Sequence, residues 1–143
     1  MISPRKVVLD ANILIRAVFG KKAFALLQKY EDNAEFYTPD YCVKEALAKI
    51  PEIAAKRQEI PETAELLLLL AVKNVVRVVD HSFYDEFETS ARARISTRDV
   101  GDWPVVATAL LLDAPIWTED KDFFGTGIAT WTTDRIEIYL RDA

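Results

Sequence analysis

The sequence predicts an α/β domain with a mostly parallel sheet, and two patterns support this. Short apolar segments alternate along the 143 residues with longer segments of helical periodicity, and this alternation is typical of strand–helix–strand units. The first apolar segment, residues 7–10 (VVLD), is polar only at its final aspartate, which is typical of a strand buried on both faces. Because a domain usually holds about 100–200 residues and no linker or repeat interrupts the chain, we expect one domain over residues 1–143.

The expected elements follow in order from these patterns. Strands are expected at residues 7–10, 35–38, 75–80 and 115–118, and helices at 13–17, 23–30, 82–95 and 101–112. A further helix is expected after Thr38 and Pro39, because threonine is a good N-cap and proline suits the first helical position. The tail, residues 128–140, fits both a strand and a helix.

One predicted helix, which begins at Pro61, carries five consecutive leucines at positions 66–70. Proline suits the first position of a helix because its missing N–H would have no partner there. A helix that is apolar all round is buried, either in the core or in an interface between subunits. We expect one of these two environments for the leucines.

The composition excludes several kinds of site. The chain has 23 acidic and 18 basic residues and a formal net charge of −5, which argues against capture of nucleic acid by a broad basic face. A metal-dependent enzyme is compatible with this charge, because a bound divalent cation inverts the local sign. One cysteine, Cys42, and one histidine, His81, exclude an internal disulfide and a metal site built from thiolates or from two imidazoles. Four glycines exclude a Walker-type phosphate loop and a GxGxxG fingerprint.

No segment indicates a membrane or a secretory route. The longest apolar run, residues 66–72, holds seven residues, whereas a membrane span needs about 20. The N-terminal residues lack the apolar stretch of a signal peptide. We therefore expect a cytoplasmic protein without a membrane partner.

Acidic residues lie at the ends of the expected strands. Asp10 ends the first strand, Asp80 ends the third, and Asp120 follows the fourth. Ligands of open parallel sheets bind beyond the carboxyl ends of the strands, so these carboxylates are candidates for a shared site. Each candidate also has a simpler interpretation. Asp10 and Asp102 would cap the helices that they precede, and Asp120 with Asp122 would form a solvated acidic turn.

Carboxylates without histidine or cysteine form an all-oxygen site, which favours Mg²⁺ or Mn²⁺ over zinc or copper. Such a site supports in-line attack of a metal-activated water on a phosphodiester. Without the metal, clustered carboxylates repel one another. The pattern therefore predicts metal-dependent phosphodiester hydrolysis.

Two motifs resemble the PIN domain family of small metal-dependent nucleases. Residues 98–110 (RDVGDWPVVATAL) hold Asp-Trp-Pro at a helix start, and residues 116–127 (IWTEDKDFFGTG) hold a Thr-x-Asp-x-Asp-Phe turn. The resemblance extends from residue 7 to about residue 134 and is loosest around Glu45. It implies a three-layer α/β/α sandwich and a Mg²⁺- or Mn²⁺-dependent endoribonuclease that acts on RNA. VapC-type toxins of toxin–antitoxin pairs belong to this family, so the resemblance also implies an antitoxin protein and a homodimer as partners.

The resemblance also implies the site residues. The catalytic residues and metal ligands are Asp10, Glu45, Asp102 and Asp120. Asp122 is a further acid of the metal site, Asn12 is a supporting polar residue, and Asp99 competes with Asp102 for the third acidic position. By pattern alone, Glu45 has a plain surface position, because it faces away from the apolar side of its helix, Val43, Leu47 and Ile50.

Basic and aromatic residues have two interpretations each. Arg92, Arg94 and Arg98 are candidates to contact RNA phosphates, although Glu88 precedes Arg92 by four residues and would pair with it. Trp103, Trp117 and Trp131 could stack on bases, but two of them lie in strand or helix-start positions that are typical of core aromatics.

Two other functions compete with a ribonuclease. A phosphatase of the haloacid-dehalogenase type needs a second aspartate two residues after the first, and the chain has Asn12 there. A PIN scaffold that binds protein or RNA without cutting is the alternative function.

Overall fold

A computed structural model of the chain describes residues 4–95 and 100–141. Its centre is a five-stranded sheet in the order β3-β2-β1-β4-β5, in which every neighbouring pair is parallel. The strands are β1 (Arg5–Leu9), β2 (Ala34–Pro39), β3 (Val76–Val79), β4 (Ile116–Trp117) and β5 (Thr130–Trp131). The predicted α/β class with a parallel sheet is confirmed.

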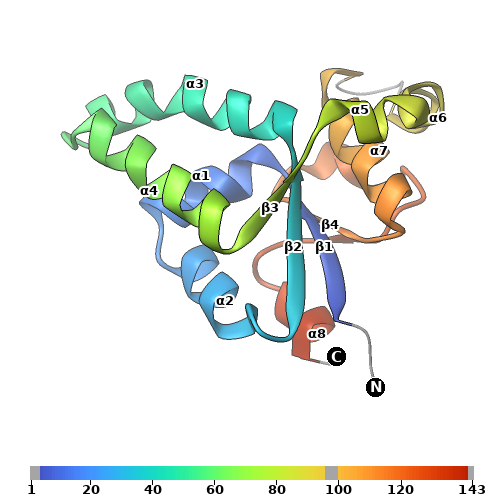
Figure 1. Cartoon of the computed structure of the whole chain (residues 1–143), viewed down its shortest axis with the longest axis horizontal. Helices are drawn as coiled ribbons and strands as arrows, with labels where there is room; N and C mark the ends of the chain where they lie inside the picture. Colours follow the sequence, from blue (N-terminus) through green and yellow to red (C-terminus); the bar gives the residue numbers. More distant parts are fainter. Residues whose placement is uncertain (1–3, 96–99, 142–143) are drawn as a thin grey trace.

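Helices cover both faces of the sheet, which gives the three-layer α/β/α sandwich that the resemblance implied (Figure 1). One layer contains α1 (Ala11–Phe19), α2 (Lys22–Tyr30), α3 (Asp40–Lys56) and α4 (Pro61–Asn74). The other contains α5 (His81–Tyr84), α6 (Glu88–Ile95) and α7 (Trp103–Leu112). The last helix, α8 (Ile136–Arg141), returns to the first layer and contacts α2.

The sheet order places a topological switch point at β1. From β1 the chain crosses to β2 through α1 and α2, and later it returns to β4, on the other side of β1, through α7. Ligand sites of open α/β sheets lie at such a point, beyond the carboxyl ends of the strands. Asp10 follows β1 directly, and Thr118 follows β4.

The core is centred on β1 and the strands beside it. Val7, Val8 and Leu9 are fully buried, as a strand covered by helices on both faces requires. Beside them, the Phe36 and Trp117 rings lie 6.2 Å apart and are tilted against each other. The prediction that a tryptophan packs in the core is therefore confirmed for Trp117.

Two local predictions were wrong. Thr38 does not cap α3, because its hydroxyl donates instead to the Leu9 carbonyl oxygen (2.8 Å), and Pro39 takes the N-cap position. The helix expected over residues 82–95 is divided by a 3₁₀ turn, Asp85–Phe87. In the ambiguous tail, the residues whose apolar spacing fitted both a strand and a helix form α8, and the short strand β5 precedes them.

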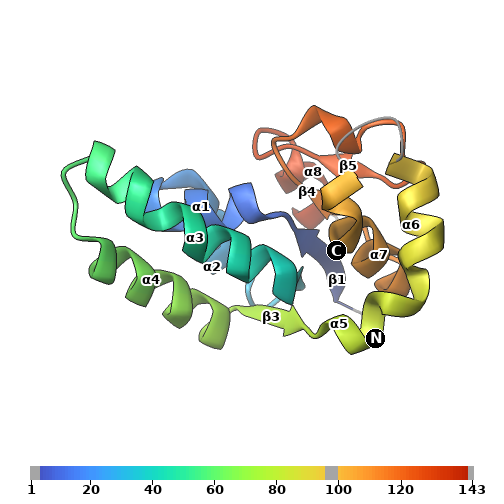
Figure 2. The same cartoon turned by 90° about the horizontal axis from the view of Figure 1, so that it is seen from above.

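The leucines of α4 occupy an unexpected position. Leu68 is buried, but Leu66, Leu67, Leu69 and Leu70 are each exposed over 45–56% of their surface. The prediction of burial in the core is therefore wrong for four of the five leucines. Figure 2 shows why, since α4 lies along the outer side of the layer that it shares with α3. Among the described helices, none combines the length and the apolar character that a membrane span requires.

Candidate functional site

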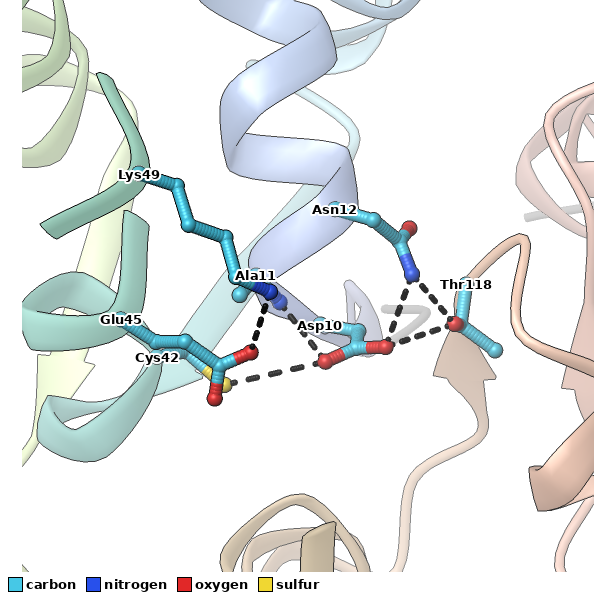
Figure 3. A network of polar contacts seen from close by, with 7 residues as sticks. All are labelled: Asp10, Ala11, Asn12, Cys42, Glu45, Lys49 and Thr118. Atoms are coloured by element: carbon cyan, nitrogen blue, oxygen red, sulfur yellow. Dashed lines mark hydrogen bonds and ion pairs between the residues drawn. The ribbon is translucent and has the colours of Figure 1, made fainter. Parts of the chain in front are cut away.

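Asp10 lies at the junction of β1 and α1. It is the N-cap of α1, and its Oδ1 accepts a hydrogen bond from the Ala11 amide (2.7 Å). Its Oδ2 accepts hydrogen bonds from the side-chain amide nitrogen of Asn12 (2.9 Å) and from the Thr118 hydroxyl (2.7 Å). Only 5% of the residue is exposed. The capping interpretation is therefore correct but incomplete, because the second carboxylate oxygen faces β4 (Figure 3).

The charge of Asp10 is poorly compensated by the protein. Burial raises the pKa of Asp10, and the charges of Glu45 and Asp120 raise it further, against the lowering effect of the hydrogen bonds from Thr118 and Ala11. Within residues 4–95 and 100–141, no lysine or arginine forms an ion pair with this carboxylate. A buried carboxylate without a cationic partner is costly in free energy. A divalent cation would remove this cost.

Asn12 and Thr118 join the ends of β1 and β4. The Thr118 hydroxyl oxygen accepts from the Asn12 side chain (3.1 Å) and from the Asp120 amide (2.9 Å). The Asn12 side-chain oxygen accepts from the Glu119 amide (3.1 Å). This network fixes the backbone of the loop that carries Asp120 relative to Asp10.

Glu45 lies on α3 and points toward Asp10 (Figure 3). Its side chain is 26% exposed and pairs with Lys49 at 3.3 Å on the same helix. The plain surface position that the pattern favoured is therefore wrong. The reason is that α3 packs against α1, so that the face of α3 opposite its expected apolar side borders the end of β1.

Asp102 reaches the same region from the other helical layer. It occupies the N-cap position of α7, but its side chain makes no capping hydrogen bond. The pKa of Tyr41 is raised, first by burial and then by the charges of Glu45 and Asp102. The phenol of Tyr41 thus lies within the electrostatic reach of both acids.

Asp120 and Asp122 share the turn after β4. Asp120 caps the 3₁₀ turn Lys121–Phe123, and its Oδ1 accepts from the Asp122 amide (2.9 Å). Both residues are half-buried. The interpretation as a plainly solvated acidic turn is therefore wrong, because Asp120 faces Asp10 closely enough to raise its pKa.

Within the described ranges, no three of the four predicted acids bring their ligand atoms within 4.8 Å of one another. Among the described residues, the group of potential ligands whose atoms all lie within 4.8 Å of one another is Asp40, Asp80 and His81. These three have structural partners. Asp40 accepts from the Tyr84 hydroxyl (2.6 Å) and the His81 amide (3.0 Å), and Asp80 caps α5 through Ser82. Asp40 was not predicted, and its only signal in the sequence is its place after the second strand.

The arginines predicted to contact RNA have other partners where the structure describes them. Arg92 pairs with Glu88 at 2.7 Å and lies over the Trp103 ring. Arg94 donates to the Thr126 carbonyl oxygen (2.8 Å). The pairing interpretation is confirmed for Arg92. Arg98 and Asp99 lie outside the described residues.

A different basic surface adjoins the acids. Arg16, Lys21 and Lys22 line a pocket of about 360 Å³ together with Glu119 and Asp134, and Glu119 is bonded through its amide to Asn12. Lys22 pairs with Asp134 at 2.8 Å. Sequence reasoning missed this surface because its cations come from the end of α1 and the start of α2, and only the fold brings them beside the loop after β4.

Comparisons with known proteins identify the family of the chain. The sequence matches the model of the PIN domain over residues 8–141. The chain belongs to the PIN domain family. No curated protein matches the sequence of this PIN domain at a significant level.

Several solved structures share the fold of this PIN domain. One is the VapBC2 complex of Rickettsia felis bound to promoter DNA (TM-score 0.69, 12% identity), which aligns over 89% of this chain and 98% of its own. A toxin–antitoxin complex from Klebsiella pneumoniae has a TM-score of 0.65 and 20% identity over 89% and 97% of the two chains. VapC20 of Mycobacterium tuberculosis, described as a sarcin–ricin loop cleaving toxin, has a TM-score of 0.61 and 15% identity over 86% and 96%.

Proposed function

We propose that this PIN domain is a metal-dependent endoribonuclease. The observation that carries the proposal is the environment of Asp10. This buried carboxylate faces two further acids, and within the described part of the chain its hydrogen-bond partners are all uncharged. Folding has placed negative charges together at the switch point of the sheet, where the site would gain stability by binding a divalent cation.

The donors present fit Mg²⁺ or Mn²⁺. Carboxylates and amide oxygens are ligands for hard cations, and Mg²⁺ usually keeps several waters beside one or two carboxylates. Waters that complete the coordination of such an ion can bridge to carboxylates that do not contact one another. Its proposed ligands, direct or through water, are Asp10, Glu45, Asp102, Asp120 and Asp122. When bound, the metal would lower the pKa of a water and neutralise charge on a phosphodiester.

The protein's own part is to position these ligands. The hydrogen bonds of Asn12 and Thr118 fix the second oxygen of Asp10 and orient the turn that carries Asp120. Asp102 lies at the start of α7 without using its carboxylate as a cap. The basic pocket lined by Arg16 and Lys21 lies beside the turn of Asp120 and would bind the phosphates that flank the scissile bond.

We further propose RNA as the substrate and an antitoxin as a partner. The fold is shared with one structure described as a toxin that cleaves the sarcin–ricin loop and with several toxin–antitoxin complexes. These likenesses support the proposal at the level of fold, and the acidic site supports it at the level of chemistry.

The test is incubation of the purified protein with a pool of cellular RNAs, with and without Mn²⁺, followed by mapping of the new ends. Asp10→Asn and Asp102→Asn should each lower the cleavage rate by at least about a hundredfold, since each removes a proposed ligand. Asp32→Asn is the matched control, because Asp32 is exposed and follows α2 away from the site. Cleavage retained by either site variant would contradict the role of that residue.

The second candidate is a PIN scaffold that does not cut. The separation of the four acids favours it, because none of them belongs to the group of described ligand atoms within 4.8 Å of one another. This candidate predicts neither Mn²⁺-dependent cleavage nor a rise in melting temperature on addition of Mn²⁺. The same titration therefore separates the two functions.

A further inference from the structure

The helix α3 carries an aromatic ring, a carboxylate and an ammonium in one line beside Asp10. Tyr41, Glu45 and Lys49 are spaced by four residues, which places them one above another on the same face of a helix. We call these three residues the α3 row. Each of them directly precedes a buried residue of the helix, so the row follows the border of the buried face. Cys42 fixes the orientation of this face, because its Sγ lies 4.0 Å from Asp10 Oδ1.

The α3 row is open to solvent at the acidic site. Tyr41 is 39% exposed, and the Lys49 side chain is 55% exposed, whereas Asp10 is buried. Burial, the charge of Glu45 and a hydrogen bond to that carboxylate raise the pKa of Tyr41, and the charge of Asp102 raises it further. Asp102 precedes α7, which lies on the other side of β1 from α3 (Figure 2). The row therefore borders the proposed metal site on its solvent side.

Lys49 places a positive charge beside one of the acids. Its Nζ pairs with Glu45 Oε1 at 3.3 Å, and its side chain reaches back along α3 toward this carboxylate (Figure 3). An ammonium has three N–H donors, so it can bind a phosphate while one donor stays on Glu45. An exposed ion pair of this kind contributes little to stability, which leaves the ammonium available to a ligand.

The chemistry of the α3 row matches that of a single-stranded RNA. Aromatic rings stack on bases of any sequence, and lysines bind the phosphates between them. Tyr41 and Lys49 lie about 12 Å apart along the helix axis, at 1.5 Å per residue, with Glu45 midway. A base at Tyr41 and a phosphate at Lys49 would thus leave the phosphodiester between them beside Glu45.

We propose that Tyr41 and Lys49 are the RNA contacts on the α3 side of the site, where the Tyr41 ring stacks on a base and Lys49 binds a neighbouring phosphate. This inference rests on the proposed function, because it states how the same site holds its RNA. It adds a base contact, since among the described residues those that line the basic pocket of Arg16 and Lys21 include no aromatic ring.

Fluorescence anisotropy with a labelled single-stranded RNA of mixed sequence tests the base contact. The series is made in the Asp10→Asn background, in which we expect cleavage to be lost. Tyr41→Leu should weaken binding at least about fivefold at every salt concentration, because leucine keeps the apolar bulk but lacks the flat ring. Tyr41→Phe is the matched control and should change the affinity by less than about twofold, because it keeps the ring. Full affinity in Tyr41→Leu, or equal losses in the two variants, would overturn the stacking contact.

The salt dependence of the same binding tests the phosphate contact. Lys49→Gln should make the slope of log affinity against log salt shallower by about 0.7, and Lys49→Arg should keep the slope. Lys56→Gln is the matched control, because Lys56 forms the same kind of pair on α3, with Glu52 at 3.3 Å, but lies farther along the helix from Asp10. An unchanged slope in Lys49→Gln, or an equal change in Lys56→Gln, would overturn the phosphate contact.

The two proposals fail in different ways. If the Asp10→Asn chain binds RNA but the wild type never cleaves it with Mn²⁺, the proposed ribonuclease is contradicted, and the binding series still decides the two contacts. If the wild type cleaves RNA and neither Tyr41→Leu nor Lys49→Gln weakens binding, only the contacts are overturned. If the Asp10→Asn chain binds no RNA, the contacts and the substrate are both overturned.

Discussion

At the scale of single residues, the two carboxylate oxygens of Asp10 have different roles. One oxygen caps a helix and the other accepts two hydrogen bonds beside β4. Burial and two neighbouring acids raise its pKa, so that the folded protein holds a proton on Asp10 at a pH where the unfolded chain has released it. Stability therefore falls as the pH rises from the unfolded toward the folded pKa.

We predict that Asp10→Asn removes this pH dependence. Without divalent ions, the free energy of unfolding of the wild type should fall relative to that of Asp10→Asn as the pH rises from about 4 toward neutrality. Urea unfolding at several pH values measures the difference. The test is how the difference between the two free energies changes with pH. The amide that replaces the Asp10 carboxylate would face the Asn12 side-chain amide, and the resulting loss of stability does not depend on pH. A constant difference would contradict the raised pKa.

Gly127 shows a second constraint at this scale. Its φ is +84°, which a residue with a side chain rarely adopts, and a Cβ at this position would lie 2.7 Å from an Arg94 guanidinium nitrogen. We predict that Gly127→Ala lowers the free energy of unfolding by about 1–3 kcal/mol. In an Arg94→Ala background, Gly127→Ala should lower the free energy of unfolding by a smaller amount, because only the backbone strain remains. An equal loss of unfolding free energy in both backgrounds would show that the Arg94 guanidinium moves aside freely.

At the scale of elements, α8 is attached to α2 through one glutamate. Glu137 accepts hydrogen bonds from the Lys29 ammonium (2.6 Å) and the Tyr30 hydroxyl (2.6 Å). These hydrogen bonds lower the pKa of Glu137. A lowered carboxyl pKa contributes stability above the unfolded pKa, and this contribution is lost as the pH falls through the folded pKa.

We predict that Glu137→Gln destabilises the protein at neutral pH and that the difference from the wild type shrinks in acid. Free energies of unfolding between pH of about 3 and 7 measure it. Glu86→Gln is the control, because Glu86 is an exposed glutamate of the 3₁₀ turn Asp85–Phe87. A difference for Glu137→Gln that persists unchanged in acid would mean that packing, and not the carboxylate charge, attaches α8.

The elements also show what the sequence could and could not predict. The position of β1 and of Asp10 followed from local pattern, because a short continuous apolar run bounded by a polar residue is typical of a buried strand. The two-residue strand β5 was missed, since its signal is its pairing with β4 and not its own composition. Pattern alone favoured a surface position for Glu45, and only the resemblance assigned it to the site. Its environment depends on how α3 packs against α1, a contact between segments that no local spacing encodes.

At the scale of the whole molecule, the excess of acidic over basic residues is compatible with RNA binding only if basic side chains are concentrated at one place on the surface. The net charge is −5, yet Arg16, Lys21 and Lys22 gather at one pocket beside the acids. Such a local concentration can bind phosphates although the chain as a whole repels them.

We predict that Arg16→Ala/Lys21→Ala weakens RNA binding more at low salt than at high salt. For every cation–phosphate pair that the substitutions remove, the slope of log affinity against log salt should become shallower by about 0.7. Fluorescence anisotropy in an Asp10→Asn background measures binding without cleavage. Lys56→Ala, at the far end of α3, is the control. Equal weakening at all salt concentrations would indicate a packing role for the two side chains.

The buried thiol next to Asp10 has a practical consequence. Cys42 is the chain's single cysteine, its Sγ lies 4.0 Å from Asp10 Oδ1, and burial raises its pKa well above the ordinary value. An alkylating reagent can reach it only when α3 separates from β1, so the labelling rate reports how often this region opens. Protection by Mn²⁺ would then reveal ion binding by the unaltered protein, with no RNA in the assay.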